Sequence, residues 1–184
     1  MNSKKQLGHD LEKYSLYDKE KLCTVIYADL TDKTVFAEKT AGFTGLEQFP
    51  EYLTLIFEVD AFFLNDDRHL NNIASIEENG KYSYCPIFDN SAALLSNTQL
   101  SQMDIEPEVL IAAVTARPLG TTFTRQMRSA EALFGQQLHI PRFTKPQIKD
   151  LLAPMLEFYP ERDRGIIAER AAECIIQRQR FLGE

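Results

Sequence analysis

The sequence is poor in the residues that build disulfide frameworks and zinc sites. Its 184 residues include only three cysteines and three histidines, and neither set is clustered. They are Cys23, Cys85, Cys174, His9, His69 and His139. An odd number of scattered cysteines indicates free thiols in a reducing cytoplasm, and zinc sites need closely spaced Cys and His pairs. We therefore expect a cytoplasmic protein without disulfides or zinc.

Long apolar runs and basic clusters are also missing. No apolar run is long enough to span a membrane, and no secretory signal peptide opens the chain. The formal net charge is −7, whereas a protein that grips a nucleic-acid backbone needs a basic face. We therefore expect no membrane insertion and no direct contact with nucleic acid. A partner protein that binds DNA is compatible with this charge.

Glycine is present, but never in the spacing that cradles phosphate. The chain has eight glycines, and no G-x-G-x-x-G or Walker pattern can be assembled from them. Such loops need closely spaced glycines because backbone N–H groups must approach the phosphate oxygens. The sequence therefore holds no glycine-rich nucleotide loop.

The remaining composition is that of an ordinary globular protein. Apolar residues make up 44% of the chain and charged residues 26%, and this length can form one domain with a substantial core. There is no internal repeat, low-complexity segment or linker. The sequence therefore predicts a single domain over residues 1–184.

The most informative stretch holds a polar cluster, a turn and an apolar run. The cluster, NDDRHLNN at residues 65–72, follows a long apolar segment, and a short apolar run farther on ends at Asp89. The dipeptide Asn79-Gly80 lies between them with alternating residues on both sides, which is typical of a β-hairpin. A hairpin over residues 73–89 would bring the cluster and Asp89 together.

Phosphoryl transfer fits this arrangement. In protein kinases a catalytic-loop Asp accepts the proton of the acceptor hydroxyl, and an Asn and a second Asp hold Mg²⁺. Asp67 and Asn72 have the kinase spacing of five, and Asp89 follows the next apolar strand. Mg²⁺ prefers a few hard oxygen ligands and lets substrate phosphates complete its shell. These residues predict a site for ATP and Mg²⁺, with Asn72 and Asp89 as metal and cofactor ligands.

Two short motifs in this stretch carry a family resemblance. The sequence DRHLNNI at residues 67–73 resembles the D-R-H-x-x-N-I loop of phosphoinositide kinases and the D-x-H-x-x-N loop of HipA-like serine/threonine kinases. The sequence PIFD at residues 86–89 is similar to the HipA segment that ends in the metal-binding Asp. Residues 89–91, DNS, lack the Gly of the usual D-F-G motif, as HipA-like proteins do. The resemblance therefore favours the bacterial HipA-like family.

The resemblance implies a role for each matched residue. Asp67 would position and deprotonate the acceptor hydroxyl. Asn72 and Asp89 would hold Mg²⁺ against the β- and γ-phosphates of ATP. His69 would orient the catalytic loop by hydrogen bonding, or else be a buried structural histidine.

The neighbouring polar residues have structural interpretations. We expect Arg68 to form an ion pair with Asp66 or Asp60, and Asn65 and Asn71 to shape the loop. An alternative interpretation of the whole stretch is a polar loop that caps a hydrophobic helix, followed by an ordinary turn.

The periodicity and the resemblance together predict a mainly α (α+β) fold, the large lobe of a kinase with one small catalytic β-hairpin. Its parts would be a catalytic loop at 65–73, the hairpin at 73–89 and an activation-like segment at 89–118. We expect residues 31–43 to be a loop or a short extended piece around residues 35–37. The expected helices are one or two in 10–30, then 44–64, 104–116, 121–138, one from Thr144 and 162–182.

The resemblance also implies parts that the sequence lacks. Lys39 is not the nucleotide lysine, because only 28 residues separate it from Asp67. That interval is too short for the helix, two strands and long helix that intervene in kinases, so we expect a solvated lysine. The small nucleotide-binding lobe is therefore expected to be absent. The chain would be a fragment, or be completed by a partner chain, or no longer catalyse.

We therefore expect the catalytic lobe of an ATP- and Mg²⁺-dependent protein kinase, which transfers the γ-phosphate to a protein hydroxyl. Its partners would be a protein substrate and a partner chain or antitoxin-like protein. A non-catalytic interaction module, or one half of a split kinase, is the main alternative. A phosphoinositide-type lipid kinase is a further one, which the lack of a basic membrane-facing patch disfavours.

Overall fold

The computed structural model describes residues 11–18, 21–29, 33–98 and 102–181. Its elements, in chain order, are β1 (Leu11–Asp18), β2 (Lys21–Asp29), α1 (Lys33–Thr44), α2 (Phe49–Phe63), η2 (Leu70–Asn72), β3 (Ser75–Glu78), β4 (Lys81–Tyr84), η3 (Ala93–Leu95), α3 (Pro107–Ala113), α4 (Phe123–Phe134), α5 (Lys145–Leu156) and α6 (Glu161–Arg178). The described chain is mainly helical with two small antiparallel sheets, which confirms the expected mainly α (α+β) class.

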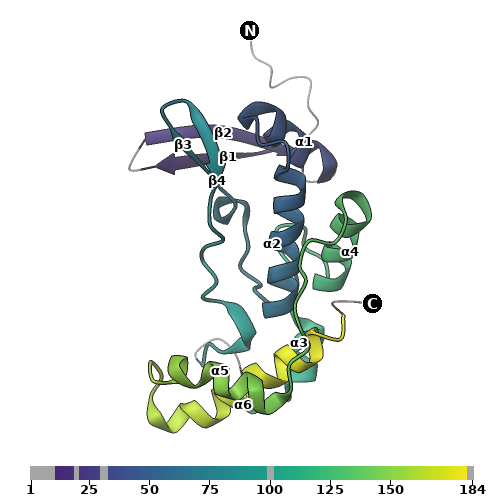
Figure 1. The fold of residues 1–184 in the computed structure, drawn as a ribbon. Coiled ribbons are helices and arrows are strands. Elements are labelled where there is room, and N and C mark those ends of the chain that lie inside the picture. The colour runs from purple at the N-terminus through teal and green to yellow at the C-terminus, as the bar shows by residue number, and fades with distance from the viewer. Residues whose placement is uncertain (1–10, 19–20, 30–32, 99–101, 182–184) are drawn as a thin grey trace.

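The elements form an elongated molecule (Figure 1). The β1–β2 and β3–β4 hairpins lie with α1 at one end, α2 and α4 occupy the middle, and α3, α5 and α6 lie at the other end. None of the described helices combines the length and the apolar character needed to cross a membrane.

The prediction of one or two helices in residues 10–30 is wrong. β1 and β2 pair antiparallel, from Leu11 opposite Asp29 to Asp18 opposite Lys21. The segment is rich in aromatic and β-branched residues, which favour a pleated strand over a helix. Its apolar residues also fit a helical spacing, so periodicity alone could not separate the two structures.

The prediction of a loop over residues 31–43 is wrong from Lys33 onward, because α1 begins there. The sequence of α1 has little amphipathic periodicity, which is why its pattern gave no helix signal. Ala37 and Thr40 are nevertheless buried, and α1 packs against α2 and β2. Tertiary packing, rather than propensity, therefore stabilises this helix. Lys39 is exposed, as expected.

The pattern from Thr44 to Glu47 matches a capping box and predicts a helix start at Thr44, but α2 begins five residues later, at Phe49. Thr44 instead ends α1, where its hydroxyl donates to Thr40 O at 2.7 Å. Pro50 lies in the first turn of α2, where a missing backbone N–H costs least. The helix ends as expected, with Leu64 in the left-handed conformation.

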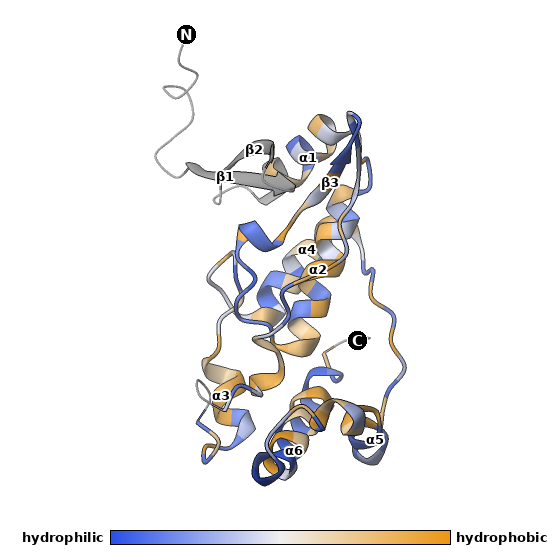
Figure 2. Cartoon of the chain, turned by 90° about the vertical axis from the view of Figure 1, so that its left-hand side faces the viewer, coloured by the Kyte–Doolittle hydropathy of each residue, from blue (hydrophilic) through white to orange (hydrophobic). Residues whose placement is uncertain are grey.

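Two clusters of buried apolar residues form the core, and α2 contributes to both. One contains Ala61, Phe62, Leu64, Leu95, Ala116, Phe123, Met127, Ile148, Ala172, Cys174 and Ile175. The other contains Ala37, Phe49, Leu53, Ile56, Phe57, Leu70, Ile73 and Ala130. Figure 2 shows hydrophobic residues along α2 in the middle of the molecule and hydrophilic ones along β3. A helix that is apolar on most faces is buried, so α2 is the axis of the fold.

The β-hairpin predicted around Asn79-Gly80 is confirmed, but it is shorter than the predicted 73–89. β3 and β4 pair from Ser75 opposite Tyr84 to Glu78 opposite Lys81. Asn79 and Gly80 both have positive φ, at 54° and 75°, as a two-residue type I′ turn requires. Residues 85–90 form no regular structure, so Asp89 follows an irregular segment rather than a strand.

The C-terminal helices lie close to their predicted positions. Helix α3 ends at Ala113, three residues earlier than predicted. Glycine favours helix ends, and Gly135 ends α4 with a φ of 78°, inside the predicted range 121–138. Helix α5 follows a capping box formed by Thr144 and Gln147. The last helix, α6, ends at Arg178, four residues before the predicted end at 182.

The predicted inner and outer faces of α5 and α6 need correction. Helical spacing in the sequence places Leu151 and Ile166 on the inner faces of these helices, but they are 64% and 44% exposed. The charge pattern places Arg170 and Arg178 on a solvated face, but both are buried. The terminal Nη2 group of Arg170 donates to three backbone carbonyls of residues 102–105, and Arg178 Nε donates to Ala61 O at 2.6 Å. Backbone carbonyls can therefore hold a buried arginine, which a charge pattern does not reveal.

Candidate functional site

The candidate site lies in the loop between α2 and β3 and in the irregular segment after β4. Asn72 Nδ2 donates to Asp89 Oδ2 at 2.8 Å and to Asp67 O at 3.3 Å. Of the four residues predicted to form the site, the fold therefore joins the side chains of Asn72 and Asp89 and places the backbone of Asp67 beside them. The β3–β4 turn produces this contact because it reverses the chain between Asn72 and Asp89.

A buried ion pair between Arg68 and Asp60 supports the contact between Asn72 and Asp89. Arg68 Nε lies 2.9 Å from Asp60 Oδ2, and both side chains are almost fully buried. Another Arg68 nitrogen donates to Asn72 O at 3.1 Å and to Phe88 O at 2.5 Å. The guanidinium therefore ties α2, the loop and the segment before Asp89 together. Of the two predicted partners, Arg68 pairs with Asp60.

Asn65 and Asn90 extend the same network. Asn65 Nδ2 donates to Asp60 Oδ1 at 3.1 Å and to Asp89 O at 3.3 Å. Asn90 Oδ1 accepts from Arg68 at 2.5 Å and from Asn65 at 3.4 Å. Asn65 is therefore a loop-shaping residue, as predicted. The sequence did not indicate a role for Asn90, because a polar residue after Asp89 is typical of an ordinary turn.

Burial dominates the electrostatics beneath the loop. It raises the pKa of the Asp60 carboxyl, and the hydrogen bonds from Arg68 and Asn65 oppose that rise. Burial also raises the pKa of the Asp66 carboxyl, and the neighbouring charge of Asp67 raises it further. Desolvation favours the neutral form of an acid in this way.

Asp67 lies at the surface of the site with an unforeseen partner. Its side chain is 52% exposed, and Oδ1 accepts from Arg117 NH1 at 3.0 Å. Arg117 belongs to the turn that links α3 to α4. The sequence RPLG at residues 117–120 indicates a helix break but no partner for Asp67, and fifty positions separate Asp67 and Arg117. No local pattern could have found this pair.

His69 does not join the network through Nδ1. That atom is buried without a hydrogen-bond partner. The backbone of His69 contributes instead, because its N–H donates to Asp67 O at 2.8 Å. This bond tightens the turn that presents Asp67. Asn71 is exposed beside it.

The donor set suits a metal that uses few protein ligands. Asp89 and Asn72 offer a carboxylate and an amide oxygen, which are hard ligands of the kind that Mg²⁺ prefers. Asp89 is exposed and has a left-handed backbone with a φ of 54°, and such strain is often found at functional sites. The described residues contain no group of three or more His, Cys, Asp or Glu residues able to hold a metal. Substrate phosphates would have to complete the shell.

No model of a known protein family matches the chain, and no curated protein or solved structure matches it.

Proposed function

We propose that the chain is the catalytic lobe of a Mg²⁺- and ATP-dependent phosphotransferase of HipA-like type, acting on a protein hydroxyl. The observation that carries this proposal is the Asn72–Asp89 contact at 2.8 Å, with Asp67 beside it. Kinases bring a catalytic Asp, an Asn and a metal-binding Asp together in the same way for phosphoryl transfer. The buried Arg68–Asp60 pair beneath them would fix their geometry, as preorganised catalysis requires.

Each residue has a defined task in this reaction. Asp89 and Asn72 would hold Mg²⁺, which would supply charge neutralisation at the β- and γ-phosphates of ATP. The acceptor hydroxyl oxygen attacks the γ-phosphorus, and the bond from that phosphorus to the bridging oxygen breaks. The hydroxyl proton passes to Asp67, and ADP leaves. Positioning and charge neutralisation supply most of the rate in such reactions.

The order of the elements supports the proposal. In kinases, two strands and a long helix precede the catalytic loop. Here the paired strands β1 and β2 come before the long helix α2 and the loop, with helix α1 between β2 and α2. β1 also lies against η2, within the loop. We therefore assign β1 and β2 to the edge of the nucleotide-binding lobe.

The proposal includes partners and a compartment. The remaining parts of the nucleotide lobe come from a partner chain or from further residues of a longer protein. The substrate is a protein, and an antitoxin-like protein is a candidate regulator. Cys85 and Cys174 are free thiols, which fits a reducing cytoplasm.

Calorimetric titration of Mg-ATP tests the proposal. The protein is purified natively with its bound partners, as wild type, Asp89→Asn and Asp150→Asn. Asp150 is an exposed residue of α5, so its variant is a control matched in charge and chemistry. We expect the wild type and Asp150→Asn to bind Mg-ATP and Asp89→Asn to lose binding. Equal binding by all three proteins would sink the metal assignment.

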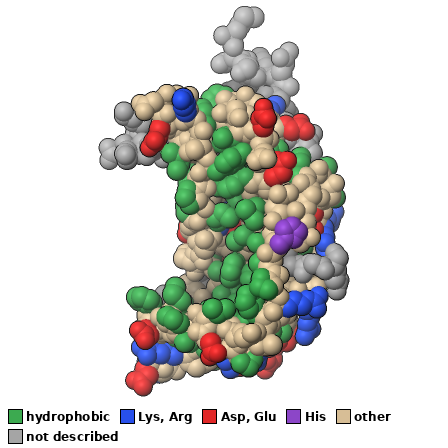
Figure 3. All heavy atoms as spheres, in the orientation of Figure 1, with side chains coloured by type: hydrophobic (Ala, Val, Ile, Leu, Met, Phe, Trp, Pro, Cys, Tyr) green, Lys and Arg blue, Asp and Glu red, His purple; other side chains and the backbone are tan. Residues whose placement is uncertain are grey.

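A non-catalytic interaction module is the second candidate, and exposed apolar side chains favour it. Leu151, Met155 and Phe158 are 64%, 58% and 86% exposed at the α5–α6 end. Figure 3 shows hydrophobic side chains on this face of the molecule, at its middle and its lower end. A module of this kind would bind no Mg-ATP in the titration above.

A further inference from the structure

The turn between α3 and α4 presents a cation to the surface of the candidate site. Arg117 NH1 donates to Asp67 Oδ1 at 3.0 Å. Among the described residues, Arg117 is the only one paired with the Asp67 carboxylate in an ion pair. The contact uses one carboxylate oxygen, so Oδ2 is left for another donor.

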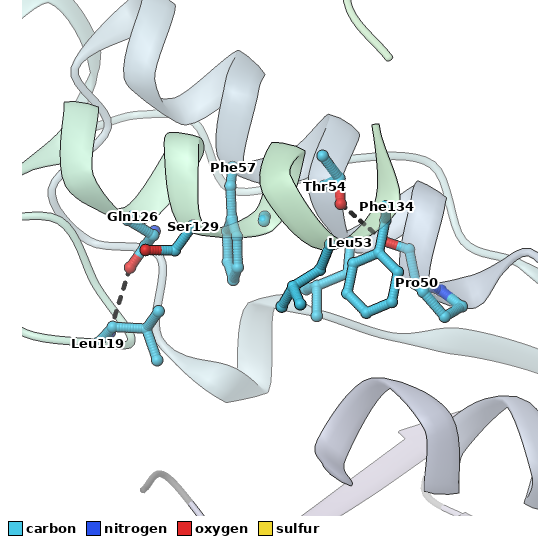
Figure 4. A pocket seen from close by; sticks show the side chains of 10 residues that line it. Pro50, Leu53, Thr54, Phe57, Leu119, Gln126, Ser129 and Phe134 are labelled. Carbon is cyan, nitrogen blue, oxygen red and sulfur yellow. Dashed lines mark hydrogen bonds between the residues drawn. The ribbon is translucent and has the colours of Figure 1, made fainter. Parts of the chain in front are cut away.

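A buried glutamine fixes the turn that carries Arg117. Gln126 of α4 is 1% exposed. Its Nε2 donates to Arg117 O at 2.9 Å, and its Oε1 accepts from Leu119 N at 3.3 Å. Figure 4 shows Gln126 on α4 reaching toward Leu119. The backbone of Arg117 is therefore held on the core, while its side chain extends to the site.

Stability alone does not account for this arrangement. Both side chains are about half exposed, and exposed ion pairs contribute about 0–1 kcal/mol. The position of the Arg117 charge, beside the carboxylates of the loop, indicates its role better than the small energy of the ion pair does. The Arg117 charge also lowers the pKa of the Asp66 carboxyl, opposing the effects of burial and of Asp67. The guanidinium therefore acts on both carboxyl groups of the loop.

We propose that Arg117 is a positioning residue for phosphoryl transfer, which holds Asp67 by Oδ1 so that Oδ2 faces the acceptor hydroxyl. This inference rests on the proposed function, because it assigns Asp67 as the group that accepts the hydroxyl proton. Gln126 is the support that keeps Arg117 in place. A carboxylate held by one oxygen samples fewer orientations than a free one, which is the benefit of a preorganised site.

The test measures transfer of radiolabelled γ-phosphate from Mg-ATP to casein, the acceptor probe. The proteins, purified natively with their partners, are wild type, Arg117→Gln, Arg117→Lys and Arg125→Gln. Arg125 is exposed on α4, so its variant loses the same charge close by. We expect Arg117→Gln to lower kcat about 10- to 100-fold, as loss of a charged hydrogen bond does. The KM for ATP stays unchanged, and Arg117→Lys recovers part of the loss.

The outcomes separate this inference from the function on which it rests. A rise in the KM for ATP with kcat unchanged would show a role in binding and overturn the positioning role. Equal kcat in Arg117→Gln and Arg125→Gln would also overturn it, while leaving the proposed function intact. No transfer by the wild type would overturn both. Thermal unfolding of each variant identifies any loss that comes from misfolding, and Arg117→Lys then decides the question.

Discussion

Arg68 is a buried charge that joins three parts of the chain. It contacts Asp60 in α2, the carbonyl of Asn72 in the loop, and the carbonyl of Phe88 before Asp89. A buried ion pair is costly to assemble, but removing one partner leaves an uncompensated charge in the interior. The pair therefore matters most as a constraint on geometry at the candidate site.

Replacing Arg68 should destabilise the whole protein. Arg68→Met keeps much of the side-chain volume but leaves the Asp60 carboxylate unpaired, so we expect a loss of about 3–5 kcal/mol in the free energy of unfolding. Urea denaturation measures it. The double variant Asp60→Leu/Arg68→Met should recover part of that loss, because neither charge is then buried. If Arg68→Met lowered the free energy of unfolding by less than about 1 kcal/mol, as for surface ion pairs, the structural role of the Arg68–Asp60 pair would be refuted.

Tyr52 makes stability depend on pH at the alkaline end. Its hydroxyl donates to Cys85 O at 2.5 Å and so links α2 to the segment that leads to Asp89. Burial, and then the charge of Cys85, raises the pKa of Tyr52 to about 12. An unfolded tyrosine has a pKa of about 10. Because the folded value is higher, this contribution is complete below pH 10 and is lost as the pH rises toward 12.

The contribution of Tyr52 is tested by measuring the urea midpoints of the wild type and Tyr52→Phe at pH 9 and at about pH 11.5. Other tyrosines and the lysines titrate in both proteins, so the difference between the two carries the information. We expect the wild type to lose more stability over this interval than Tyr52→Phe, which has no phenol to ionise. Parallel losses in the two proteins would show that Tyr52 does not contribute.

At the scale of the elements, the sequence predicts well where a local signal is strong. Asn79-Gly80 identifies the hairpin because few other dipeptides adopt two consecutive positive φ values. Gly135 and Thr144 mark a helix end and a helix start through equally local chemistry. These signals place α4, α5 and the β3–β4 turn within a few residues of their observed bounds.

The misses occur where tertiary packing decides. The apolar residues of β1 and β2 fit helical spacing and strand propensity alike, and only the pairing of the strands resolves the choice. Arg170 is drawn inside by backbone carbonyls of a segment nearly seventy positions away. The Arg117–Asp67 pair joins residues of different elements in the same way. Contacts of this kind have no signature in a short window of sequence.

On the scale of the whole molecule, the fold places the candidate site where its parts converge. Helix α2 contributes to both apolar clusters, and the loop at its C-terminal end carries Asp67 and Asn72. The hairpin returns the chain to this loop and delivers Asp89. The turn before α4 adds Arg117 from another direction. A packed core therefore supports the polar side chains of the candidate site, as the proposed transfer reaction requires.

The most direct measurement is a crystal structure of the protein with Mg²⁺ and a non-hydrolysable ATP analogue. We predict Mg²⁺ bound by oxygens of Asn72 and Asp89 at about 2.0–2.1 Å, with phosphate oxygens completing the shell and Asp67 facing the γ-phosphate. The Arg68–Asp60 pair should stay in place beneath them. A nucleotide bound elsewhere, or a metal held without Asp89, would contradict the account.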